Sequence, residues 1–82
     1  MNLFELKDFA EKILLEIDKE IEYHSDELAK EIEEHDFWEQ YGEEESYRAK
    51  VEELEDLLFS LRLQRQKKQT ELDNINRRIQ NL

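Results

Sequence analysis

The sequence predicts an all-α fold: an elongated antiparallel helical hairpin, coiled-coil-like, that assembles into a larger helical bundle. Ten positions between residues 51 and 82 repeat with a 3-4 spacing, which is typical of a helix packed against another helix. The chain contains no proline and one glycine, Gly42, so no strong helix breaker interrupts either half. Although 43% of the residues are charged, the apolar residues are strictly periodic, and disordered polyelectrolytes lack such periodicity.

The first helix is expected over residues 3–36. Its apolar residues recur at close to 3.6 positions, as in a straight amphipathic helix. Asn2 is placed to cap this helix, with Glu5 three residues later as a capping-box partner. Ser25, followed by two acids, is another plausible helix start. A break near Tyr23–Ser25 therefore stays open, and one continuous helix is favoured because no glycine or proline enforces the break.

The second helix is expected over residues 46–82, after a turn over residues 37–45 centred on Gly42, and the whole chain of residues 1–82 is one domain. If the chain folds back at this turn, the numbers of facing residues add to about 82. Arg65 and Lys68 then lie opposite the acid-rich segment 16–20, and we expect them to fix register and specificity at some cost in stability. These two cations occupy the centre of the repeat, which comprises Val51, Leu54, Leu58, Leu61, Arg65, Lys68, Leu72, Ile75, Ile79 and Leu82.

Some large apolar residues do not belong to the seam between the two helices. Phe59 and Leu63 stand one turn apart and are rotated by about 100–140° from Leu58. A two-helix protein has no second surface to cover them, so we predict that they bind a partner, either another copy of the chain or a different helical protein. Three residues of the first helix also lie outside its narrow stripe: Phe4, Phe9 and Leu15.

Half of the eight aromatic residues cluster around the turn: Phe37, Trp38, Tyr41 and Tyr47. Aromatic side chains of this kind are favoured anchors in protein interfaces. The alternative is that they form a hydrophobic plug at the end of the hairpin.

The turn resembles that of the small secreted WXG-type helical hairpins, which carry tryptophan–x–glycine between two helices. Here Trp38 and Gly42 are two residues further apart than in that motif. In length and topology the chain also resembles small helical proteins that pair with secreted effectors. Both resemblances imply an all-helical hairpin that acts through a protein partner.

The formal net charge is −11, and it is unevenly distributed. Residues 1–36 carry a net charge of −9, residues 37–61 carry −6, and residues 62–82 carry +4. Since a phosphate backbone would repel most of the molecule, we expect no direct binding of nucleic acid. The acidic residues do permit an alternative function, an acidic mimic of nucleic acid similar to small phage-type inhibitors, which would occlude a basic groove. Its contact face would comprise Glu43, Glu44, Glu45, Glu52, Glu53, Glu55 and Asp56.

The remaining residues give no sign of catalysis. Without cysteine the chain has no disulfide or thiolate metal site. His24 and His35 do not complete the Glu-x-x-His motif of di-metal bundles, because positions 21 and 32 are isoleucine. We therefore expect no enzyme activity, no cofactor and no metal. With no membrane span and no signal peptide read from the sequence, a cytoplasmic location is expected, with export by a route without a cleaved signal left open. The expected function is a protein–protein interaction module that acts by helix–helix association.

Overall fold

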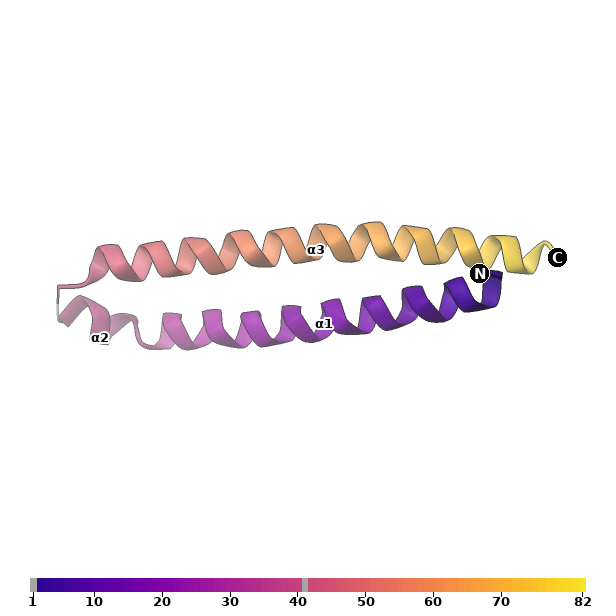
Figure 1. The fold of residues 1–82 in the computed structure, drawn as a ribbon. Helices are drawn as coiled ribbons and strands as arrows, with labels where there is room; N and C mark the ends of the chain where they lie inside the picture. The colour runs from indigo at the N-terminus through magenta and orange to yellow at the C-terminus, as the bar shows by residue number, and fades with distance from the viewer. Residues whose placement is uncertain (1, 41) are drawn as a thin grey trace.

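The computed structural model describes residues 2–40 and 42–82, apart from the side chain of Trp38, and these residues form three helices (Figure 1). They are α1 (Leu3–Glu33), α2 (His35–Gln40) and α3 (Glu44–Gln80). The two long helices lie side by side and antiparallel, with both chain ends at one end of the molecule and α2 at the other. The molecule extends over 63 × 17 × 14 Å. The predicted elongated all-α hairpin is confirmed.

The start of α1 is capped by Asn2, as its sequence predicted. The Glu5 backbone N–H donates to Asn2 Oδ1 at 2.9 Å, and Asn2 Nδ2 donates to Glu5 Oε1 at 3.1 Å. The helix continues without interruption through residues 23–25, so the alternative of two helices is not what the structure shows. It ends at Glu33, earlier than expected, where the Glu34 N–H bonds back to the Lys30 carbonyl at 3.1 Å.

The segment between the long helices differs in detail from the predicted turn over residues 37–45. Six residues of this region form the short helix α2, and α3 already begins at Glu44. The reversal itself occurs at Gly42, whose φ of 73° lies in the left-handed region that glycine adopts without steric cost. The Gly42 N–H donates to the Glu39 carbonyl at 3.2 Å, which closes the turn.

The core is a single seam between α1 and α3. Near the chain ends Ala10, Leu14 and Leu72 form a buried cluster, and Ile75 packs against it. The other buried side chains are Ile17, Leu54, Leu58 and Leu61. Two helices share only one interface. Each core side chain therefore packs against the facing helix alone, and the rest of both helices is exposed to solvent, so the core is thin.

One contact across the seam and one at the turn define the register of the hairpin. Arg65 of α3 bonds to Asp18 of α1, and His35 of α2 stacks on Tyr47 of α3. The residue numbers in each pair add to about 82, which agrees with the fold-back expected from the sequence. The register matters for function because it decides which side of α3 is covered by α1 and which side remains exposed.

Candidate interaction surfaces

The most extensive exposed apolar feature of α3 is the pair Phe59 and Leu63. Their side chains are 64% and 44% exposed, whereas the adjacent seam residue Leu58 is 3% exposed. A helix places successive residues about 100° apart, so a helix that buries Leu58 against α1 turns Phe59 and Leu63 away from α1. Of the partner-binding residues predicted from the sequence, Phe59 and Leu63 are therefore accessible on this chain.

Phe59 and Leu63 belong to a longer row on the same side of α3, which we call the outer stripe. Its members follow one another at intervals of three or four residues, and all of them are exposed. The acidic members precede the apolar pair, and polar or basic members follow it. The outer stripe comprises Glu45, Ala49, Glu52, Asp56, Phe59, Leu63, Gln66, Thr70, Asn74 and Arg77.

The exposed apolar residues of α1 are arranged differently. Phe4 and Leu15 share one direction on the helix, but about three turns separate them. Phe9 and Tyr23 share a second direction and lie about four turns apart, while Ile32 points in a third. These side chains are isolated from one another, so α1 offers no apolar pair comparable to Phe59 and Leu63.

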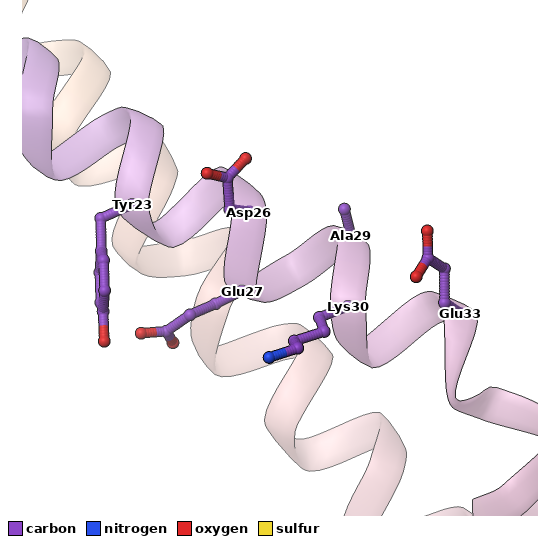
Figure 2. A pocket seen from close by; sticks show the side chains of 6 residues that line it. All are labelled: Tyr23, Asp26, Glu27, Ala29, Lys30 and Glu33. Atoms are coloured by element: carbon purple, nitrogen blue, oxygen red, sulfur yellow. The ribbon is translucent and has the colours of Figure 1, made fainter.

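A shallow furrow runs along α1 near the turn (Figure 2). Figure 2 shows that its side chains project from consecutive turns of this one helix, and no other element contributes to its lining. A ligand site normally encloses most of its ligand within a concavity, which a furrow on a single helix cannot do. Its lining residues are Tyr23, Asp26, Glu27, Ala29, Lys30 and Glu33.

At the turn, a polar and aromatic contact joins α2 to α3. His35 Nε2 lies 3.2 Å from both carboxylate oxygens of Glu44, to which it donates a hydrogen bond. The His35 ring also stacks on Tyr47, with ring centroids 4.3 Å apart and planes inclined by 27°. Tyr47 is half-buried and therefore contributes to closing the end of the hairpin.

The other predicted aromatic anchors are Phe37, Trp38 and Tyr41. Phe37 is 56% exposed on α2. The side chain of Trp38 and the whole of Tyr41 lie outside the described residues. Of the described side chains of this cluster, Tyr47 makes a contact inside the hairpin and Phe37 is an exposed ring at its end.

Three potential metal ligands come together on α2. The ligand atoms of His35, Asp36 and Glu39 lie within 4.8 Å of one another. Asp36 and Glu39 are exposed, and His35 Nε2 already donates to Glu44. Exposed carboxylates at this spacing are common on helices without a bound ion, so this group does not define a metal centre.

The two cations in the seam have different partners. Arg65 Nε donates to Asp18 Oδ1 at 2.5 Å, so this pair joins α3 to α1. Lys68 Nζ instead donates to Glu71 Oε2 at 2.6 Å, on its own helix. The acid-rich segment of α1 therefore neutralises Arg65 as expected, whereas Lys68 finds its anion three residues further along α3.

The acids proposed as a mimic surface do not share one side of α3. Glu45, Glu52 and Asp56 are members of the outer stripe, Glu53 is rotated away from it by about a quarter turn, and Glu43 precedes α3 as its N-cap. Glu44 is half-buried and bonds to His35. The remaining acid, Glu55, is exposed.

Sequence reasoning missed one polar group in the seam. Glu31 is half-buried, and its Oε2 atom is buried without a hydrogen-bond partner among the described residues. His24 Nδ1 is also buried and lies 3.7 Å from Glu27 Oε1. The signal was present in the spacing, since His24, Leu28 and Glu31 of α1 and His35 of α2 follow a 4-3-4 pattern.

Comparison of the chain with models of known protein families, with curated proteins and with solved structures gave no significant match. Within the described residues, every helix is too short or too polar to cross a membrane.

Proposed function

We propose that this protein is a non-enzymatic interaction module that binds a protein partner by helix–helix association through the outer stripe of α3. The observation that carries the proposal is the exposure of Phe59 and Leu63, one turn apart, on a helix whose other side already packs against α1. Large apolar side chains that are exposed next to each other are characteristic of surfaces that bind other proteins.

The surroundings of this pair support the proposal. Polar and charged residues border it at both ends of the outer stripe, as the rim of an interface borders its apolar centre. The surface is formed by a regular helix held by the seam, so a partner helix would meet side chains that are already ordered. Pre-ordering lowers the entropic cost of binding.

The proposal is tested by binding experiments with the full chain and two variants. The double variant Phe59→Asp/Leu63→Asp places two charges in the apolar centre and should abolish association. Leu15→Asp is the matched control, because Leu15 is exposed to a similar degree on α1 and lies off the outer stripe. Sedimentation of the purified chain detects self-association, and capture from native lysate detects other partners.

Retention of the same partner by Phe59→Asp/Leu63→Asp would contradict the proposal. So would a wild-type chain that stays monomeric up to about 300 μM, a concentration at which even weak interfaces associate, and that captures nothing sensitive to this double variant.

A second candidate function, acidic mimicry of nucleic acid, is favoured by one specific observation. Six of the seven acids proposed for it are exposed, five on the first half of α3 and Glu43 at its N-cap. A basic groove would bind them through long-range attraction, so binding should weaken steeply with salt. Reversal of Glu52, Glu53, Glu55 and Asp56 to lysine should then abolish binding. Association through Phe59 and Leu63 should instead survive about 0.5 M salt, since salt does not screen apolar burial.

A further inference from the structure

We infer that the partner of the outer stripe is a second copy of this chain, bound antiparallel so that the two α3 helices pack together around a two-fold axis near Leu61. The inference rests on the proposed function, because it names the occupant of the same surface. Two independent features of α3 lead to it: the position of the apolar pair and the order of charges along the helix.

The apolar pair is close to the middle of α3, which runs from Glu44 to Gln80. When two copies of a helix cross antiparallel about an axis at position 61, the numbers of facing residues add to about 122. Phe59 of one copy then faces Leu63 of the other, and the same contact is repeated on the other side of the axis. The two exposed pairs cover each other, and a long stretch of helix remains on both sides for further contacts.

The charges along α3 are complementary in this alignment. Asp56 faces Lys67 of the second copy, Arg48 faces Asp73, and Glu45 faces Arg77, and the two-fold axis generates each pair twice. All of these side chains are exposed on the single chain. A parallel alignment in register would instead place each charge beside its own copy, so like charges would meet throughout.

The two-fold axis also limits the assembly to a dimer. An isologous contact uses the same surface on both subunits and therefore closes on itself. A contact between the outer stripe and the acidic outer side of α1 would join different surfaces and could continue into longer chains. The antiparallel α3 pair covers Phe59 and Leu63 and pairs three acids of α3 with three bases in one closed arrangement.

One feature of the alignment opposes it. Arg62 lies next to the axis, so the two copies of Arg62 are brought to the same side of the interface. Both the small apolar centre and this like-charge contact indicate a weak dimer, with dissociation in the micromolar range or above. The association should therefore be measured over concentrations up to about 300 μM.

The arrangement is tested by crosslinking single-cysteine variants of the full chain, which has no native cysteine. In Ser60→Cys the two thiols lie on the same side of the dimer with an axial offset of about 3 Å, so a short bifunctional maleimide should join them rapidly. In Ala49→Cys, the matched control on the outer stripe, the two thiols lie about 36 Å apart and should not be joined. Preferential crosslinking of Ala49→Cys, or equal crosslinking of both variants, would overturn the antiparallel arrangement.

A charge exchange provides a second test that does not depend on crosslinking. Asp56→Lys places two lysines opposite each other and should weaken the dimer at least fivefold. The double variant Asp56→Lys/Lys67→Asp should restore it. Within one helix these residues are about 16 Å apart along the axis, so rescue requires the second copy. Failure of the rescue would contradict the proposed register.

The outcomes separate this inference from the proposed function. If the chain stays monomeric but binds another protein through contacts that Phe59→Asp/Leu63→Asp removes, then the second copy is the wrong occupant and the proposed function stands. If neither self-association nor such binding occurs, both fail.

Discussion

The inner and outer sides of α3 both carry apolar side chains, but only the inner side forms a continuous seam. On the inner side Leu54, Leu58 and Leu61 are 3–4% exposed, whereas Phe59 on the outer side is 64% exposed. The seam has apolar residues at most positions over about nine turns, and the outer stripe has large ones at two adjacent positions. The long apolar row packs against α1 of the same chain, and the short row bordered by charges stays exposed, where we propose that it serves a weak and reversible association.

Truncating one residue on each side of α3 tests this difference most directly. Leu58→Ala removes a buried side chain from a thin core, so the free energy of unfolding should fall by about 2–4 kcal/mol. Phe59→Ala should change the stability of the isolated chain by less than about 0.5 kcal/mol, since its side chain is already in solvent. Urea unfolding followed by circular dichroism, at a low micromolar concentration where association is negligible, measures both values. Similar losses for the two variants would mean that Phe59 supports the hairpin itself.

A second change makes the inner side more uniform. Replacing Arg65 and Lys68 with leucine removes the polar centre of the seam and the pair between Arg65 and Asp18. Because these side chains are half-exposed, the gain in stability should be modest, on the order of 1 kcal/mol. A continuous apolar seam no longer penalises shifted or parallel alignments, so larger or mixed oligomers should appear.

A melting curve and sedimentation equilibrium on the double variant test both expectations. A variant that melts lower and keeps a single oligomeric state would identify Arg65 and Lys68 as stabilising ion-pair partners rather than determinants of register. Asp18→Asn is the control for the Arg65 contact, since it removes the charge of the partner and leaves the seam residues unchanged.

The sequence was sufficient to predict the features of the hairpin that follow a regular spacing or a local motif. The 3-4 spacing identified the side of α3 that faces α1, and the Asn2 cap was readable from a local motif. Phe59 and Leu63 were separable from the seam because their rotation from Leu58 follows from helix geometry alone. Each of these features depends on positions close in sequence or on a regular period.

Features that depend on three-dimensional contacts were not predictable in the same way. The helix α2 forms where a turn was expected, and its His35 contacts Glu44 and Tyr47 from a different helix. The sequence predicts that Lys68 pairs with the acids of α1, whereas in the structure it pairs with Glu71, one turn away on α3. The periodic spacing of residues does not predict either contact, because both contacts depend on which carboxylate or ring is nearest once the chain has folded.

A third prediction concerns the turn that brings the inner side of α3 against α1. Gly42→Ala keeps the space free, because a Cβ at this position would meet nothing within 4 Å. The φ of 73° remains unfavourable for alanine, so the chain should lose about 1 kcal/mol of stability. Gly42→Asn should lose less, since asparagine tolerates the left-handed region better. Equal losses in urea unfolding would show that something other than backbone conformation determines the effect.

The smallest expected effect concerns the outer side of α3. Arg62 is exposed beside the apolar pair, and in the antiparallel dimer it meets its own copy near the two-fold axis. Arg62→Gln removes this repulsion, so the dissociation constant should fall by about two- to threefold, equivalent to the few tenths of a kcal/mol typical of exposed charge pairs. Unfolding of the dilute chain should not change, because the side chain does not face α1. Sedimentation equilibrium at low salt gives the largest difference, since salt screens exposed charges. Weaker association of Arg62→Gln would mean that Arg62 contacts an anion of the partner, and that the two copies are not related by an axis at this position.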